Sequence, residues 1–110
     1  MTPEDRRALE TAGTVADVAA GQVLIERGQH GTGLYVILDG SVVVDAPEGS
    51  RELGAGAVLG ERALLSADGL RTARVRAATD LRVLAVDRVQ FERLCEDDPK
   101  LAERLEAEAS

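Results

Sequence analysis

Short runs of β-branched and aliphatic residues alternate with glycines and polar turns between residues 14 and 86. Each run has the length of a β-strand, and the clearest ones cover residues 23–25, 34–38, 42–44 and 81–86. Many short strands joined by close turns are typical of an antiparallel sandwich or roll. The pattern therefore predicts a mainly β fold, a jelly-roll-like antiparallel β-roll that spans residues 14–86.

Two connections between these runs have clear turn chemistry. Asp39 and Gly40 form the first, and the Pro-Glu-Gly-Ser sequence at residues 47–50 forms the second. Glycine accepts a positive φ, and proline presets the first corner of a turn. We therefore expect the chain to reverse sharply at both places.

A helical pattern precedes the strand region. Thr2, Pro3 and Asp5 have the spacing of a helix start, because a threonine at the cap can bind the backbone three residues later. Gly13 lies where such a helix would end. A short N-terminal helix is expected.

Residues 87–109 are expected to form two further helices. Asp87 can cap the first helix, whose apolar face recurs at spacings of three and four with Phe91, Leu94 and Cys95. Asp98 and Pro99 restart a helix. The apolar positions of this last helix are Leu101, Ala102 and Leu105.

The composition limits this fold to one domain with an aliphatic core. The chain has 110 residues, of which 45% are hydrophobic, so it can close one core and has no room for a second. Tyr35 and Phe91 are the only aromatic residues, which leaves few rings to stack on a base. We expect residues 1–110 to form a single domain.

The charge and the termini narrow the range of partners. The net charge is −7 and there is no basic stripe, so direct nucleic-acid binding is not expected. The first ten residues lack an apolar signal core, and no apolar run approaches the length of a membrane span. We expect a cytoplasmic protein without membrane contact. Twelve arginines against one lysine, with abundant alanine, hint at a bacterial source with a GC-rich genome.

The strand pattern breaks between residues 54 and 77, where a glycine-rich stretch leads into a short helical turn at residues 61–65. Gly54, Gly56 and Gly60 let the backbone approach a ligand closely. The first turn of a helix presents unpaired N–H groups and a partial positive charge, which suit a phosphate oxygen. An ordinary strand-to-helix connection explains the same pattern, so this feature alone does not define a site.

The strand that follows places an arginine toward the interior. Small apolar residues at positions 73, 75 and 77 alternate with Arg74 and Arg76, and by the same alternation Arg71 points inward. A buried guanidinium is costly unless it meets an anion, and arginine suits two-point contact with phosphate. The alternative is that Arg71 lies at a frayed strand end, where it reaches water, Glu61 or Asp68. Spacing alone does not choose between the two.

These residues resemble the cyclic nucleotide-binding domain family of catabolite-activator-like regulators, cyclic-nucleotide-dependent kinases and gated channels. The resemblance is carried by the pattern Gly60-Glu61, Ala63-Leu64-Leu65, Arg71 and Thr72-Ala73, which is similar to the phosphate-binding cassette of the family. It extends to residues 20–24, 33–40 and 86–105, and thus covers nearly the whole chain.

The resemblance implies a role for each cassette residue. Arg71 would pair with the cyclic phosphate, and Glu61 would accept a hydrogen bond from the ribose 2′-OH. The backbone N–H groups of Ala63 and Leu64 would hold phosphate oxygens, and Gly60 would be a position of close approach. The full set of implied ligand-binding residues is Gly60, Glu61, Arg62, Ala63, Leu64, Arg71, Thr72 and Ala73.

The base is less well specified than the phosphate. A hydroxyl such as that of Thr72 can bond to guanine, yet bacterial regulators of the family that bind cAMP also carry a hydroxyl here. We favour cAMP over cGMP because of the bacterial composition. The last helix would offer only Leu101, Arg104 and Leu105 as a lid, so we expect weak discrimination between the two bases.

Other classes of protein fit less well. A cupin-type enzyme needs several histidine ligands for its metal, and His30 is the only histidine. No second histidine can serve as base for a serine or cysteine nucleophile. We therefore expect no enzyme, no metal site and no cofactor other than the ligand, cAMP or cGMP. A degenerate roll that lost its ligand and serves as a protein-interaction or dimerisation module stays as the alternative.

As a regulator, the domain is expected to signal through its C-terminal helices. Phosphate binding would tighten residues 60–65, and the helix that begins at Asp87 would repack. The downstream effector is unknown, and similar regulators carry a further domain beyond the last helix. A homodimer is a further option, in which Leu101 and Leu105 would pair between two copies.

Overall fold

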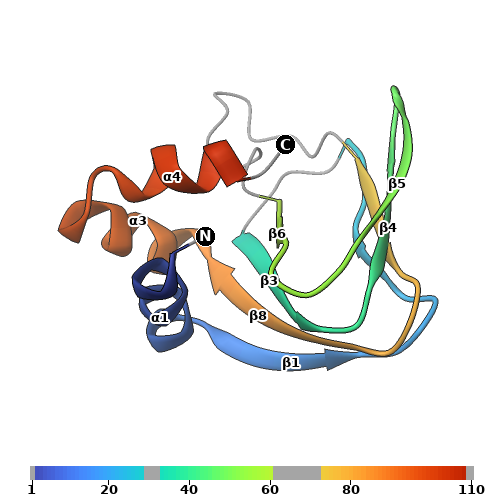
Figure 1. Ribbon diagram of the computed structural model, residues 1–110, viewed down its shortest axis with the longest axis horizontal. Helices are drawn as coiled ribbons and strands as arrows, with labels where there is room; N and C mark the ends of the chain where they lie inside the picture. The colour runs from blue at the N-terminus through green and yellow to red at the C-terminus, as the bar shows by residue number, and fades with distance from the viewer. Residues whose placement is uncertain (1, 29–32, 61–72, 109–110) are drawn as a thin grey trace.

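The computed structural model describes residues 2–28, 33–60 and 73–108, and the side chains of these as far as residue 104 (Figure 1). In this part of the chain the helices are α1 (Pro3–Ala12), α3 (Arg88–Asp97) and α4 (Leu101–Glu108). The strands are β1 (Thr14–Val18), β2 (Val23–Ile25), β3 (Gly33–Asp39), β4 (Val42–Ala46), β5 (Gly49–Leu53), β6 (Val58–Leu59), β7 (Arg74–Ala77) and β8 (Leu81–Asp87).

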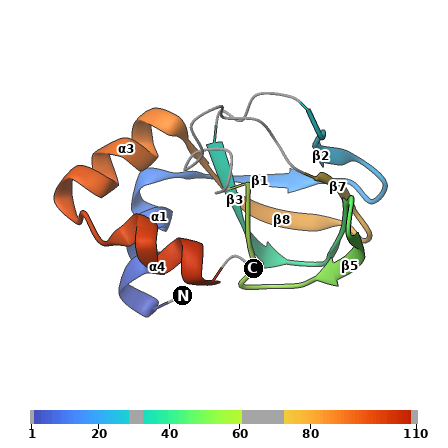
Figure 2. The same ribbon diagram turned by 90° about the horizontal axis from the view of Figure 1, so that it is seen from above.

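The strands form two four-stranded sheets in which every described pairing is antiparallel. The first sheet has the order β1-β8-β3-β6, and the second has the order β2-β7-β4-β5. Seen from above, the helices lie at one end of the molecule and the second sheet lies at the other (Figure 2). The chain is therefore an antiparallel β-roll with flanking helices, as the hydrophobic pattern predicts.

The central strands of the first sheet, β3 and β8, contribute buried side chains on both faces. On one face the sheet packs against the helices through the helix-side core, which consists of Leu9, Leu34, Val36, Val58, Leu84, Val86, Phe91 and Leu101. On the other face it packs against the second sheet through the roll core, which consists of Ile25, Ile37, Val42, Val44, Leu59, Val75, Ala77, Leu81 and Val83. A strand covered on both faces needs apolar residues at every position. This explains the continuous apolar runs of β3 and β8.

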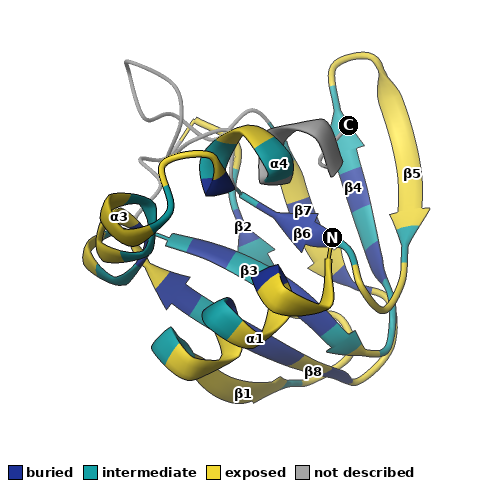
Figure 3. Ribbon diagram, turned by 60° about the vertical axis from the view of Figure 1, so that its left-hand side comes forward, coloured by how far each residue is buried: buried dark blue, intermediate teal, exposed yellow. Residues whose placement is uncertain are grey.

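The edge strands β1 and β5 are hard to recognise in the sequence, because most of their residues are exposed. Residues 49–52 of β5 are exposed, as the yellow ribbon in Figure 3 shows. β1 is also an edge strand, and most of its residues are exposed. Since neither strand buries a full face, neither needs the alternating apolar pattern by which strands are recognised.

The ends of the helices agree with the predicted caps. The Thr2 hydroxyl accepts a hydrogen bond from the backbone N–H of Asp5 at 3.2 Å. Asp87 and Gln90 form a reciprocal capping box at the start of α3, with hydrogen bonds of 2.8 and 3.0 Å. Both helices therefore begin where the sequence indicates.

Gly13 ends α1 as predicted, but for a reason that the sequence does not show. Its φ is −95°, which any residue can adopt. A Cβ at this position would lie 2.7 Å from the carbonyl oxygen of Ala85. The glycine is needed because the chain passes close to β8 as it leaves the helix.

The predicted turn at Gly40 is confirmed and is the tightest corner of the roll. Gly40 has a φ of +94°, and a Cβ there would lie 2.4 Å from the Asp80 carbonyl oxygen. The turn at residues 47–48 joins β4 to β5, also as expected. The turn at Gly40 takes the chain from the first sheet to the second, and the turn at residues 47–48 joins two paired strands of the second sheet.

Candidate functional site

The candidate site lies where the chain passes from one sheet to the other. β6 is an edge strand of the first sheet, in which Leu59 pairs with Tyr35. β7 lies inside the second sheet, between β2 and β4. The segment between these strands begins with Gly60, the last residue of the glycine-rich stretch at residues 54–60. Its described ends are Gly60 and Ala73.

Gly60 has a backbone conformation that favours glycine. Its φ is +83°, in the left-handed region that L-residues adopt only at a cost. It directly follows Leu59, a member of the roll core. The sequence predicts Gly60 as a position of close approach, and the structure adds a conformational reason for glycine there.

The alternation predicted for β7 is confirmed. Val75 and Ala77 are buried in the roll core, and Ala73 packs against that core. Arg74 and Arg76 are exposed on the opposite face. The positions of this strand that face the interior are therefore occupied by small apolar residues.

Arg74 has its own partner on the outer face. Its Nε donates to the Glu26 carboxylate at 3.0 Å, and both side chains are about half exposed. An exposed ion pair of this kind contributes little to stability. Arg74 is therefore a suitable control for any experiment on the inward-facing arginine predicted nearby.

Most of the implied ligand-binding residues fall outside the described part of the chain. Gly60 and Ala73 are described, and both border the interior of the roll. The others, which lie outside the described residues together with His30, are Glu61, Arg62, Ala63, Leu64, Arg71 and Thr72. Their roles, and the phosphate-binding helix expected at residues 61–65, stay predictions.

Tyr35 is a residue of this region that the sequence does not single out. Its half-buried side chain packs against the roll core, and its register partner is Leu59, next to Gly60. Phe91 belongs instead to the helix-side core. Strand alternation could have indicated that Tyr35 faces the roll core, because residues two apart on a strand, such as Tyr35 and Ile37, point to the same face.

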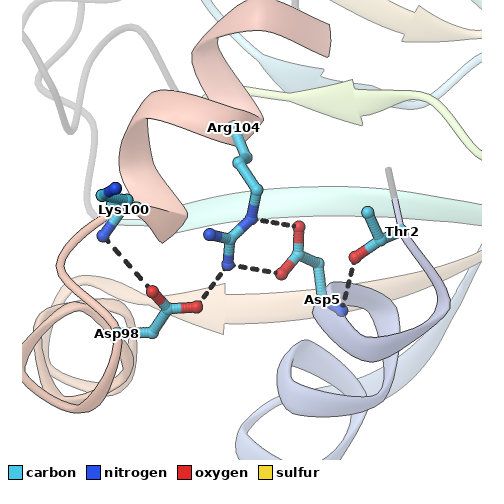
Figure 4. A network of polar contacts seen from close by, with 5 residues as sticks. All are labelled: Thr2, Asp5, Asp98, Lys100 and Arg104. Carbon is cyan, nitrogen blue, oxygen red and sulfur yellow. Dashed lines mark hydrogen bonds and ion pairs between the residues drawn. The ribbon is translucent and has the colours of Figure 1, made fainter.

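The last helix is docked on α1 through a polar network (Figure 4). Arg104 Nε donates to Asp5 Oδ2 at 2.9 Å, and Arg104 Nη2 donates to Asp5 Oδ1 at 2.7 Å. Arg104 Nη2 also donates to Asp98, which lies between α3 and α4. One guanidinium thus joins two carboxylates from separate parts of the chain.

This docking bears on two expectations for the C-terminal helix, a lid over the base and a dimer contact, and both stay predictions. Leu101 is only 2% exposed because it belongs to the helix-side core, so it does not pair with a second copy in this arrangement. Leu101 and Arg104 are also not free to cover a base while they hold these contacts. The side chain of Leu105 lies outside the described residues.

The network shifts the protonation equilibria of its members. Hydrogen bonds from Arg104 lower the pKa of the Asp5 carboxyl below its ordinary value, against an opposing effect of burial. The same arginine lowers the pKa of Asp98. The pKa of Arg104 is raised in turn by its bonds to Asp5 and Asp98. All three groups are charged at neutral pH.

Two features are absent from the described residues, a cluster of metal-ligating side chains and a membrane-spanning helix. They include no group of three or more histidine, cysteine, aspartate or glutamate side chains arranged to hold a metal ion. None of the described helices has both the length and the apolar character needed to cross a membrane.

Comparison with known proteins identifies the family. The model of the cyclic nucleotide-binding domain matches residues 15–98, which include both sheets and α3. The chain belongs to this family. The resemblance found in the sequence is confirmed, and the β-roll architecture is that of the family.

Similar proteins include regulators and channels. The chain is 40% identical over 88 residues to a cyclic nucleotide-gated potassium channel of Rhizobium etli, with 80% of this chain and 24% of the channel covered. It is 39% identical over 75 residues to a cGMP-dependent protein kinase of Caenorhabditis briggsae, with 66% of this chain and 10% of the kinase covered. The chain thus spans a quarter or less of the length of these relatives.

Solved structures share nearly the whole fold. One, from work on a cyclic-GMP-dependent signalling pathway that regulates bacterial phytopathogenesis, has a TM-score of 0.85 and 33% identity, with 96% of this chain and 87% of that chain covered. The catabolite activator protein of Thermus thermophilus has a TM-score of 0.82 and 27% identity, with 97% of this chain and 53% of that chain covered.

Proposed function

We propose that this chain is a single, non-catalytic regulatory domain that binds a cyclic nucleotide between β6 and β7. The observation that carries the proposal is the structure of the two strand ends on either side of that segment, which we call the frame. Gly60 is left-handed at the end of β6, and Ala73, Val75 and Ala77 turn inward at the start of β7. Between them the sequence contains the Glu61 and Arg71 of the family pattern.

The chemistry of these two residues fits the two polar features of the ligand. Arg71 would pair with the cyclic phosphate through two parallel hydrogen bonds. Glu61 would accept a hydrogen bond from the ribose hydroxyl. An arginine at an inward position of this strand would otherwise lie among the aliphatic side chains of the roll core, which favours an anionic ligand there.

The base is proposed to be bound weakly, with cAMP preferred over cGMP by less than about tenfold, or about 1.4 kcal/mol. Tyr35 is the one aromatic side chain at the roll core and is a candidate for contact with the base. Both nucleotides stay in the proposal, because several similar proteins carry cGMP in their descriptions.

The absence of catalysis is part of the proposal. Relatives that are enzymes by name, a protein kinase and a phosphodiesterase, are matched over only 10% and 9% of their length. This supports a regulatory role for the matched region. We place the domain in the cytoplasm, and we propose that helices α3 and α4 carry its signal to an effector.

A titration of the purified chain with cAMP and with cGMP tests the proposal, with Arg71→Ala as the critical variant. If the arginine–phosphate pair is largely desolvated, its loss should weaken binding by about 2–5 kcal/mol, roughly thirty- to several-thousandfold. Arg74→Ala is the matched control, because Arg74 is paired with Glu26 on the outer face. It should bind as the wild type does.

Two outcomes would overturn the proposal. If millimolar cAMP and cGMP leave the melting temperature of the wild type unchanged, the chain is a degenerate roll that acts as an interaction or dimerisation module. If Arg71→Ala and Arg74→Ala weaken binding equally, the phosphate does not bind at Arg71. A difference of a hundredfold between cAMP and cGMP would contradict the weak base contact alone.

A further inference from the structure

Asp5 is the one charged side chain that is buried in the described part of the molecule, and only 4% of it is exposed. It lies in the first turn of α1, where its backbone N–H is already bound by Thr2. A buried carboxylate is unfavourable unless charged or polar partners compensate for the lost water. The cap residue Thr2 also favours the ionised carboxyl of Asp5, but Arg104 has the largest effect on it.

Arg104 supplies the compensation from the other end of the chain. It lies 99 residues away in sequence, on α4, and it places two nitrogens on the two oxygens of Asp5 at 2.9 and 2.7 Å. This two-point geometry is the strongest form of arginine–carboxylate contact. The third contact, to Asp98, fixes the same guanidinium to the connection between α3 and α4.

The three residues therefore tie α4 to two places at once. If α4 leaves α1, Asp5 loses both of these hydrogen bonds, and its buried carboxylate loses its charged partner. Leu101 must leave the helix-side core in the same movement. The apolar contact resists separation in any direction, whereas the arginine fork is satisfied in one orientation only.

We propose that Asp5, Arg104 and Asp98 form a latch that couples the position of α4 to α1, so that displacement of α4 is opposed from the N-terminal end of the domain. The latch itself does not depend on the proposed function. Its effect on the response to nucleotide does, since α4 is one of the helices proposed to carry the signal. A segment that engages α1 could through this contact favour or oppose the movement of α4.

Cys95 is a natural reporter of this coupling. It is the only cysteine in the chain, it is half-buried on α3, and it packs against the helix-side core. Burial raises the pKa of its thiol, and the nearby backbone of Ala102, on α4, opposes this shift. A thiol reagent therefore reacts with Cys95 faster when α4 moves away.

The test is the rate at which 5,5′-dithiobis(2-nitrobenzoate) labels Cys95 in the full chain. Asp5→Asn keeps the size of the side chain and removes the charge, and it should accelerate labelling by about five- to thirtyfold. Arg104→Gln should accelerate it similarly. Arg104→Lys, which retains the charge without the two-point geometry, should give an intermediate rate.

Asp17→Asn is the matched control. It removes a carboxylate that accepts from Arg82 Nε at 3.1 Å, but this pair is exposed and lies on the β1–β8 edge. The labelling rate of Asp17→Asn should equal that of the wild type. Melting curves of all variants should be recorded to check that the fold is retained. If Asp5→Asn does not fold, Arg104→Gln tests the latch in its place.

The outcomes separate the latch from the proposed function. Equal labelling rates in the wild type, Asp5→Asn and Arg104→Gln overturn the latch, even if cAMP or cGMP raises the melting temperature of the wild type. Faster labelling in both variants supports the latch, even if neither nucleotide binds. If both nucleotides bind and the latch variants change the effect of nucleotide on labelling, the coupling includes the proposed ligand response.

Discussion

The two faces of the β1-β8-β3-β6 sheet carry cores of different chemical character. The roll core is built only of aliphatic side chains. The helix-side core is also aliphatic apart from Phe91, but it lies beside the buried Asp5 and the Arg104 that binds it. One sheet therefore joins a purely apolar interface to an interface that includes a charge pair.

This difference has a consequence for movement. Apolar packing has no preferred direction and changes little with pH or salt. A charge pair depends on orientation, on protonation and on its partners. The roll face is thus suited to hold the frame around Gly60 and Ala73, and the helix face is suited to change.

The largest effects should come from two leucines of β8 that face opposite sides. Leu81 belongs to the roll core and Leu84 to the helix-side core, and both are almost completely buried. Each change to alanine should lower the free energy of unfolding by about 2–5 kcal/mol. Urea denaturation measures this loss.

The same pair tests whether the two faces differ. Leu84→Ala should also accelerate labelling of Cys95, because it weakens the interface on which the helices pack. Leu81→Ala should not do so beyond the effect of its lower global stability. Equal labelling rates in two variants of equal stability would show that the faces respond as one unit.

A smaller effect is expected from glycines on either side of β6. Gly60→Ala forces an L-residue into a φ of +83° and should lower stability by about 1–2 kcal/mol. Gly56→Ala carries the same strain at a φ of +92°, with open space around the added Cβ. Calorimetric titration should show weaker cyclic nucleotide binding for Gly60→Ala only. The same loss in Gly56→Ala would assign the effect to general strain.

The smallest effect concerns pH and the helix face. The pKa of Asp5 is lower in the folded protein than in the unfolded chain, so its ionisation stabilises the folded state above the unfolded pKa. The contribution is lost as the pH falls through the folded pKa. Asp5→Asn should therefore be less stable than the wild type near neutral pH, and the gap should narrow in acid. A gap that is independent of pH would mean that the Asn change acts through packing.

The local elements could be predicted because each depends on a few neighbouring residues. The caps at Thr2 and Asp87, the turn at Gly40 and the alternation of β7 all followed from spacing alone. The edge strands β1 and β5 were not singled out, because exposed strands lack the apolar period. The reason for Gly13, a close contact with Ala85, involves a strand far along the chain.

The residues of the candidate site likewise fall into those that the local sequence predicts and those that depend on tertiary contacts. Gly60 and the inward side of β7 were predicted from local pattern, and the family membership followed from the order of a few residues between them. Tyr35 was not identified, because its nearness to Gly60 depends on the pairing of β3 with β6. Leu101 was expected at a lid or a dimer contact, since an apolar residue on a helix face does not indicate which surface covers it.

By itself, the sequence determined that this protein is an antiparallel β-roll with terminal helices and that it belongs to the cyclic nucleotide-binding domain family. These properties can be recognised from the hydrophobic period, the turn residues and a local motif, each of which spans about a dozen residues of the chain. Only the tertiary structure decided the order of the strands, the burial of Leu101 and the partner of Asp5. The carboxylate and the guanidinium meet across 99 residues because the packed helices bring them together, and no local pattern encodes that contact.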